Sequence, residues 1–490
     1  MKSLKRNFSF NILLNISSVI FPLITAPYVA RILQPDGVGL YNFANTFASY
    51  FSLVALLGIP NYGIREVSKL RDNKKGLQLF VSQILSISVI TTLLVSVLYF
   101  SLIIILKQLN ENFTIFFVAG FLVYLSPFKI DWFYKGLEEF EYITIRTLVI
   151  RVVSIICLFV FVREKNDLII YIILTVLGVA GADVWNFYKL WLSGIHPFFT
   201  TTGIGAHFKP LCILFASSIA ISVYTVLDTI MLGFITDYSE VGYYNNAIHV
   251  AKVLLALVTS FSAVSIPRFA YYVKEKNLTK ANELFNRSLS LVSLFSFPLA
   301  FIIMCVAPVF VPWFFGASFT GAIVPLMILG FLNIAIGVSN ITGLQVMIGI
   351  GMDKLFLKSI LVGTIINFSL NLILIPYWGA IGASVASVVA EFSVTITMLI
   401  FIYKYSFVRV NLLSDSFKSL FGAFLFIPLV TIIPANISAP IYLVIYGVSC
   451  ATIYVISQRV LKNSSYLLIR NIVITRMKNF AISTDKTNSD

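Results

Sequence analysis

Four ionisable side chains lie inside long apolar stretches of the chain: Asp183, Asp228, Lys252 and Glu391. A charge at the centre of a bilayer costs about 2.5–3.5 kcal/mol even on the scale from insertion experiments. Such residues therefore mark ion pathways, ligand sites or buried ion pairs. The three acids are candidates for ion coupling, and an ion pair that only fixes packing is an equally good interpretation for each of them.

Lys252 shares one helical face with Asn245 and His249, at the i, i+3 or i+4 spacing of helical neighbours. A cation in a water-filled cavity suits a phosphate or an acidic sugar, which favours a ligand role for this group. Other apolar stretches carry amides in similar stripes, and for any single amide a hydrogen bond between helices is the simpler explanation. These amides are Asn42, Asn45, Asn367 and Asn371.

Arg31 and Asp36 lie on either side of the start of a turn, Gln34-Pro35-Asp36-Gly37. A helix-end role and a ligand role are equally well supported for both. We group Arg31 with Lys252 and the amides as candidates for a substrate cavity. Asp36 joins the three intramembrane acids as a candidate for charge coupling.

The composition requires membrane helices to position these residues. Of 490 residues, 59% are hydrophobic and 11% are charged, whereas soluble domains carry about 25% charged residues. A soluble globular protein is therefore excluded. The net charge of +14 reports orientation in a membrane protein rather than nucleic-acid binding.

The apolar runs predict an all-α polytopic membrane protein with about 14 transmembrane helices. With the N-terminus in the cytoplasm, 29 of the 35 lysines and arginines fall on or beside cytoplasmic segments and three on outside connectors, as the positive-inside rule expects. The predicted spans are 10–33, 38–59, 79–106, 113–133, 143–162, 168–192, 210–235, 241–265, 285–312, 320–344, 355–376, 380–403, 417–436 and 440–461.

An internal repeat divides these spans. Val38–Ala44 (VGLYNFA) recurs as Val241–Ala247 (VGYYNNA), with five identities in seven at an offset of 203. Six spans separate the copies, so both halves have the same orientation, as in parallel repeats that enclose a central cavity. We predict two six-helix bundles, 1–208 and 209–404, two additional transmembrane helices in 405–461, and a basic cytoplasmic tail, 462–490. Because the amide stripes lie largely on the repeated spans, the set favours cavity lining.

Enzymatic function is the weaker class. A polysaccharide polymerase working outside the membrane needs a large outside loop with paired acids or a His/Arg constellation. The predicted outside connectors are all short and none contains a histidine. We find no nucleotide-binding loop, no metal-ligand spacing and no catalytic constellation, so we expect no cofactor.

The chain resembles the Wzx-type O-antigen and capsule repeat-unit flippases of the polysaccharide transporter family, in the multidrug/oligosaccharidyl-lipid/polysaccharide exporter superfamily. The matching segments are Pro27–Tyr41 (PYVARILQPDGVGLY), Gly58–Glu66 (GIPNYGIRE), Asp228–Gly233 (DTIMLG), Glu240–Tyr244 (EVGYY), Pro312–Gly316 (PWFFG) and Asn367–Ala383, followed by Glu391. One departure is Gln34, where the family usually has glycine.

The resemblance implies a protein of the bacterial inner membrane with both termini cytoplasmic. It would carry an undecaprenyl-diphosphate-linked oligosaccharide to the outer leaflet by alternating access, with ion coupling. Its partners would be this lipid, membrane lipids, and the polymerase and chain-length regulator of the pathway. The resemblance extends by position to Arg31, Asp36, Asp228 and Glu391, whereas Lys252 and Asp183 depend on the physical argument alone. A small-solute or drug cation antiporter of the same superfamily is the alternative, although its cavity should be acidic or apolar.

Overall fold

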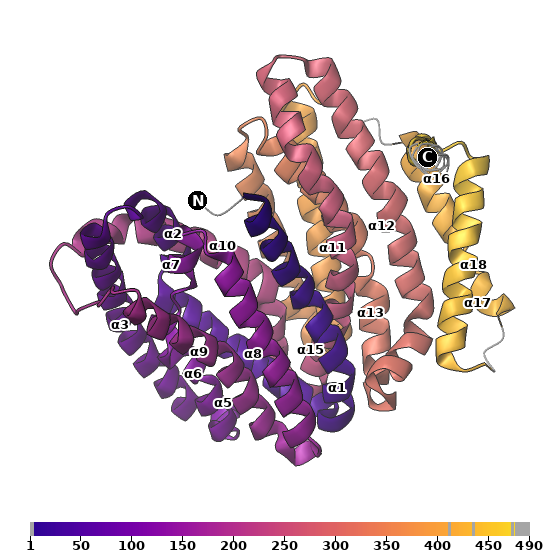
Figure 1. Ribbon diagram of the computed structural model, residues 1–490. Coiled ribbons are helices and arrows are strands. Elements are labelled where there is room, and N and C mark those ends of the chain that lie inside the picture. Colours follow the sequence, from indigo (N-terminus) through magenta and orange to yellow (C-terminus); the bar gives the residue numbers. More distant parts are fainter. Residues whose placement is uncertain (1–3, 410–412, 434–436, 472–474, 476–490) are drawn as a thin grey trace, which may run out of the picture. The chain divides into compact units, whose positions relative to one another are not determined.

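The computed structural model describes residues 4–409, 413–433, 437–471 and 475, and within them every regular element is a helix (Figure 1). The predicted end of one span at 434–436 and most of the predicted tail lie outside the described residues. The elements are α1 (Leu4–Leu56), α2 (Ile59–Leu70), α3 (Lys74–Ile105), α4 (Lys107–Asn110), α5 (Phe113–Ala119), α6 (Phe121–Tyr124), η1 (Ser126–Phe128), α7 (Asp131–Gly136), α8 (Phe140–Phe161), η2 (Lys165–Asp167), α9 (Leu168–Leu192), α10 (Gly205–Ile235), α11 (Tyr238–Lys274), α12 (Leu278–Phe315), η3 (Ala317–Ala322), α13 (Ile323–Leu329), α14 (Leu332–Ser339), η4 (Asn340–Met347, a π-helix), α15 (Asp353–Tyr405), α16 (Leu413–Phe424), α17 (Leu429–Ile432) and α18 (Ala439–Val460).

The polytopic helical architecture predicted from the sequence is confirmed. Nine helical stretches among the described residues are long and apolar enough to cross a membrane. Two of these, in α1 and α15, each contain two predicted spans, and shorter apolar helices and α11 account for the others. Each of the fourteen predicted spans thus has a helical counterpart, and the chain is a multi-pass membrane protein.

The two long helices that hold paired spans each contain one non-helical residue. In α1 this residue is Gln34 (φ 61°, ψ 172°), directly before Pro35. In α15 it is Gly379 (φ 48°, ψ −126°). Residues other than glycine rarely adopt the backbone conformation of Gln34, which costs about 1–3 kcal/mol. Gln34, which stands where the resembling family usually has glycine, therefore has a strained backbone.

The predicted fourth and tenth spans both have an irregular turn at corresponding places, where the α-helical hydrogen bonding is interrupted while the backbone stays right-handed helical. The seven-residue helix α5 is followed by Gly120, and the seven-residue helix α13 is followed by Gly330. The offset between these glycines is 210, close to the offset of 203 between the motif copies. Interrupted spans at matching places in two repeats are a known pointer to transport sites in membrane proteins.

The helices form two compact units, Met1–Asn245 and Asn246–Asp490. In the first, α1 packs against α3, α8 and α10; in the second, α12 packs against α14, α16 and α18. The units divide within α11, because α10 and the start of α11 pack on α1. The bundle boundary at 208/209 stays a prediction about repeat organisation.

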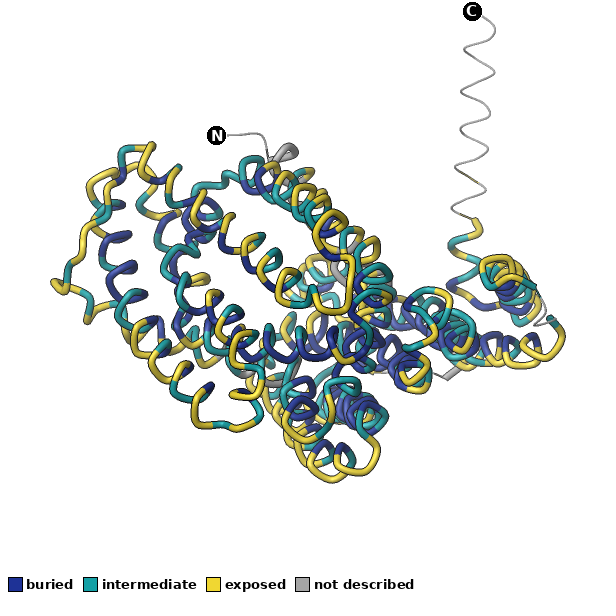
Figure 2. Tube along the Cα trace, turned by 90° about the horizontal axis from the view of Figure 1, so that it is seen from below, coloured by how far each residue is buried: buried dark blue, intermediate teal, exposed yellow. Residues whose placement is uncertain are grey.

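Large apolar side chains remain exposed on the helices of each unit. On α3, for example, Leu94 and Val97 are 69% and 68% exposed. Figure 2 shows exposed positions recurring along the helices of both units. Exposed apolar surface on this scale is not found on soluble monomers and fits contact with lipid.

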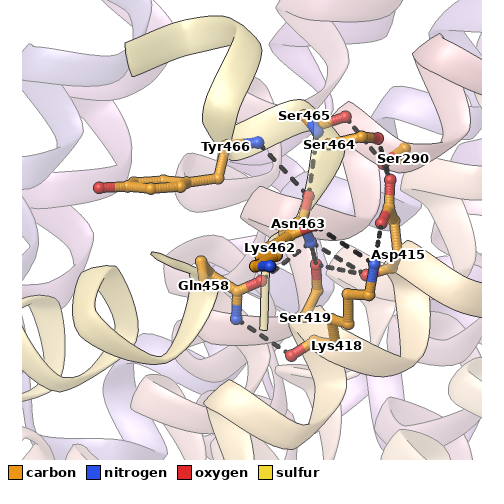
Figure 3. Close-up of polar contacts among 10 residues, drawn as sticks. All are labelled: Ser290, Asp415, Lys418, Ser419, Gln458, Lys462, Asn463, Ser464, Ser465 and Tyr466. Atoms are coloured by element: carbon orange, nitrogen blue, oxygen red, sulfur yellow. Dashed lines mark hydrogen bonds and ion pairs between the residues drawn. The ribbon is translucent and has the colours of Figure 1, made fainter. Parts of the chain in front are cut away.

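Polar contacts join the last helices of the second unit to α12 (Figure 3). Asp415, in the first turn of α16, accepts hydrogen bonds from Lys418 Nζ (2.9 Å) and Ser290 Oγ (3.2 Å). The amide of Asn463, just after α18, donates to the carbonyl oxygen of Asp415 and to Ser419 Oγ, each at 3.1 Å. Because these residues come from α12, α16 and the segment directly after α18, the cluster fixes one end of the additional pair of spans.

Candidate functional site

The two copies of the repeated motif meet inside the first unit through a reciprocal contact. A Cβ atom added to Gly39 would lie 1.6 Å from the carbonyl oxygen of Tyr238, and one added to Gly242 would lie 2.4 Å from that of Pro35. Tyr238 and Gly242 occupy the repeat positions of Pro35 and Gly39, at the offset of 203. The two backbones can approach this closely only because both motif residues are glycine. The contact therefore has local two-fold symmetry.

Asp36 lies in the same contact. It accepts a hydrogen bond from Ser239 Oγ, the residue at its own repeat position. It also lies 3.8 Å from Lys165 Nζ, and both side chains are about 60% exposed. Exposed ion pairs contribute little to stability. These partners support the helix-end interpretation of Asp36.

Arg31 is exposed on α1, one turn before the kink. The side-chain amide of Gln34 donates to the carbonyl oxygen of Arg31 at 2.7 Å, which compensates part of the strain at Gln34. On the other side of the kink, Asn42 and Asn45 are half-buried.

Asp228 and Asn245 lie close together where α10 packs against the start of α11. Asp228 is 5% exposed and accepts a hydrogen bond from the Tyr244 hydroxyl at 2.5 Å. One residue further along each helix, Thr229 Oγ1 donates to Asn245 Oδ1 at 3.2 Å. A buried carboxylate in a membrane needs such partners. Asp228 and Asn245, both candidates from the sequence, thus lie in one polar cluster between α10 and the start of α11.

The remaining candidates lie in the second unit. Lys252 and His249 are exposed on α11. Asn367 and Asn371 are buried on α15, and the amide of Asn371 donates to Asn367 Oδ1 at 3.1 Å. Glu391 is half-buried on the same helix. Lys252 and Asp228 belong to different units, and the place of Lys252 in a substrate cavity stays a prediction.

A charged cluster within the first unit went unrecognised in the sequence. Arg146 on α8 is 6% exposed and lies 3.0 Å from Asp131 on α7. The amide of Asn186 on α9 donates to Asp131 Oδ1 at 2.6 Å, and Arg146 donates to Asn186 Oδ1. The sequence feature that could have indicated this cluster is one polar residue in each of three successive apolar segments: Asp131, Arg146 and Asn186.

Asp183 lies next to this cluster, one turn before Asn186 on α9. It is 7% exposed, and its Oδ2 atom has no hydrogen-bond partner among the described residues. Lys129 is within electrostatic range, but its Nζ atom donates to Ser52 Oγ at 2.8 Å and to the carbonyl oxygen of Leu122 at 3.0 Å. Asp183 is thus a buried carboxylate near Lys129 and Arg146, which donate their hydrogen bonds to other groups. This arrangement suits a group that binds and releases a cation or proton.

A second arginine of the first unit, Arg151, lines a cleft of about 200 Å³ between α1, α8 and α9. Its guanidinium donates to Ser17 Oγ and lies 5.8 Å from the centre of the Phe21 ring. The cleft wall also contains four hydroxyl-bearing serines and threonines and the ring of Tyr171. The first unit therefore holds two separate arginine sites.

The family model described as "Polysaccharide biosynthesis protein" matches residues 4–273. The "Putative O-antigen transporter" of Escherichia coli (strain K12) is 25% identical over 413 residues, covering 82% of this chain and 97% of that protein.

Two solved structures share the fold. A structure titled "Lipid II flippase MurJ, inward closed conformation" matches with a TM-score of 0.73 at 15% identity, covering 95% of this chain and all of that chain. An inward-facing multidrug resistance transporter of the MATE family, in the MOP superfamily, matches with a TM-score of 0.59 at 13% identity, covering 78% of this chain and 95% of that one.

Proposed function

The chain belongs to the family of polysaccharide biosynthesis proteins, and on this premise we propose that it is a flippase for a lipid-linked oligosaccharide. Its cargo would be an undecaprenyl-diphosphate-linked repeat unit, moved from the inner to the outer leaflet for O-antigen or capsule assembly. The observation that carries the proposal is the family match, which takes in both copies of the repeated motif. The fold shared with a lipid flippase supports it.

The cargo explains the need for cations within the membrane. A diphosphate carries about two negative charges, and moving them through hydrocarbon without partners costs several kcal/mol or more. Lys252 is exposed on α11 and Arg31 on α1, so each can present a cation to a head group. The half-buried amides of Asn42 and Asn45 and the exposed His249 would bind sugar hydroxyls. The other amide candidates, Asn245, Asn367 and Asn371, are buried and would do so only in a conformation that exposes them. The lipid tail stays in the bilayer during transport.

Ion coupling is the second part of the proposal. Asp183 has a buried oxygen that finds no hydrogen-bond partner among the described residues, and Asp228 is bonded to Tyr244; they are the best-placed acids of the first unit. Glu391 would act in the second unit. Asp36 is the weakest member, because its contacts with Ser239 and Lys165 account for it as a helix-end residue.

The proposed location is the bacterial cytoplasmic membrane, with both termini in the cytoplasm. This orientation is supported by the concentration of lysine and arginine on the segments assigned to that side. Released outside, the repeat unit becomes the substrate of a polymerase and its chain-length regulator, which are the proposed partners.

The test is complementation of a flippase-deficient strain. Lys252→Ala should abolish surface polymer and leave lipid-linked repeat units on the cytoplasmic side, while Lys252→Arg retains partial function. The matched control is Lys274→Ala, because Lys274 is also exposed on α11 but lies at its last residue. Normal delivery to the outer leaflet by Lys252→Ala would refute the role of the lysine. Failure of the wild-type chain to deliver repeat units, combined with resistance to cationic drugs, would favour the antiporter instead.

A further inference from the structure

Arg151 lies at the middle of the membrane-spanning helix α8 and has no ion-pair partner among the described residues. The helix α8 has 22 residues, from Phe140 to Phe161. Arg151 is therefore about 15 Å from either end at 1.5 Å per residue, near the centre of a hydrocarbon layer of about 30 Å. A cation at this depth is unfavourable unless it pairs with an anion or faces a cavity.

The hydrogen bonds of Arg151 leave most of its donors unused. A guanidinium has five N–H donors. Among the described residues Arg151 makes one side-chain hydrogen bond, to Ser17, and no carboxylate lies within ion-pair distance. Arg146, five residues earlier on the same helix, has both Asp131 and Asn186 as partners. The contrast shows that the fold pairs one arginine of α8 and leaves the other open to the cleft.

The cleft beside Arg151 has the lining that an anion requires. Its volume of about 200 Å³ is far above the 10–15 Å³ that admits a single water molecule. Hydroxyl-bearing side chains from all three helices line the cleft, namely Ser18, Thr25, Ser154 and Thr175. Without a ligand, Ser18, Thr25 and Thr175 donate to carbonyl oxygens of their own helices. None of the described residues that line it is acidic. Apolar residues, Phe21 and Leu158 among them, complete the wall.

The cleft is also connected to the repeated motif. Tyr171, on its wall, has its ring centre 4.7 Å from that of Tyr41, a motif residue of α1. Tyr41 also hydrogen-bonds Thr175, another wall residue. A ligand in the cleft would therefore contact the same helix that carries the contact between Gly39 and Gly242.

We propose that the cleft around Arg151 is a binding site for the phosphate or diphosphate group of a polyprenyl lipid. Neither Lys252 nor Arg31 is among the described residues that line it, and this inference rests on the proposed function. Arginine suits this role because its planar fork can donate two parallel hydrogen bonds to one phosphate. The apolar part of the wall would accept the first isoprenoid carbons, while the hydroxyls contact the remaining phosphate oxygens.

The test measures binding of farnesyl diphosphate to the full chain in lipid nanodiscs. Arg151→Gln should weaken binding at least tenfold, and Arg151→Lys should weaken it less. The matched control, Arg163→Gln, changes an exposed arginine just beyond the end of α8 and should bind as the wild type does. Inorganic diphosphate is the second probe. Competition at similar affinity identifies a site for the free anion, whereas failure to compete identifies a lipid head-group site.

The outcomes separate this inference from the proposed function. Wild-type protein that binds neither farnesyl diphosphate nor undecaprenyl diphosphate would contradict both. Wild-type affinity in Arg151→Gln, with a lowered melting temperature, would mean that the arginine only packs against Ser17 and Phe21, and would overturn the site alone. If Arg151→Gln does not fold, the double variant Ser154→Ala/Thr175→Val removes two wall hydroxyls. It should bind at least threefold more weakly, and unchanged binding would overturn the site.

Discussion

Arg146 and Asp131 form an ion pair at 3.0 Å in which the arginine is 6% exposed and the aspartate 38% exposed. The pair ties α8 to α7, and Asn186 adds a bond from α9. Replacing Asp131 leaves a buried charge with Asn186 and a backbone carbonyl as its main partners. We expect Asp131→Asn to lower the free energy of unfolding by about 1–3 kcal/mol. Asp72→Asn, in a pair whose acid is 95% exposed, should change it little. Thermal unfolding in detergent measures both.

Gln34 is the position where a substitution should stabilise the protein. Its backbone (φ 61°, ψ 172°) is one that glycine adopts without strain. Gln34→Gly should raise the free energy of unfolding by roughly 1 kcal/mol. The relief of backbone strain stabilises the variant, while the lost hydrogen bond to Arg31 and the greater freedom of the unfolded chain offset part of that gain. Gln34→Ala removes the same bond without relieving the strain, and it should be neutral or destabilising. Equal effects of both variants would show that the backbone is not strained.

The contact between the motif copies predicts non-additive substitutions. Gly39→Ala and Gly242→Ala each force apart two backbones, at a cost of about 1–3 kcal/mol or more. Because both methyl groups enter one contact, the double variant should lose less than the sum of the two losses. Gly447→Ala, where an added Cβ meets nothing within 4 Å, is the matched control and should be tolerated. Strict additivity would mean that the glycines act independently.

The proposed orientation predicts where reporters lie. Fusions after Asn73 and Asn277 should report the cytoplasm, while fusions after Asn110 and Ser239 should report the outside. Asn73 and Asn277 are both N-cap residues whose side chains accept a backbone N–H, at the starts of α3 and α12. A clean reversal at either asparagine would refute the topology.

The spans could be predicted from the sequence because membrane helices are specified locally, by about twenty successive apolar residues. The repeat was visible because Val38–Ala44 and Val241–Ala247 retain similar letters. Neither pattern says which helices touch. The partners of Arg146 come from α7 and α9, and the pairing depends on how those helices rotate about their axes. The irregular turns at Gly120 and Gly330 also escaped prediction, because an isolated glycine in an apolar run is compatible with a continuous helix.

The reciprocal contact of Gly39 and Gly242 has the geometry of an isologous interface, the kind by which two identical subunits assemble about a two-fold axis. Here both partners are segments of one polypeptide, so the association costs no translational freedom and does not depend on protein concentration. The two copies are also free to diverge elsewhere, as Asp36 and Ser239 have done while remaining hydrogen-bonded to each other. Splitting the gene within the connector between α9 and α10 would therefore leave two fragments that retain a complementary surface, and co-expression should restore the assembly without any added linker.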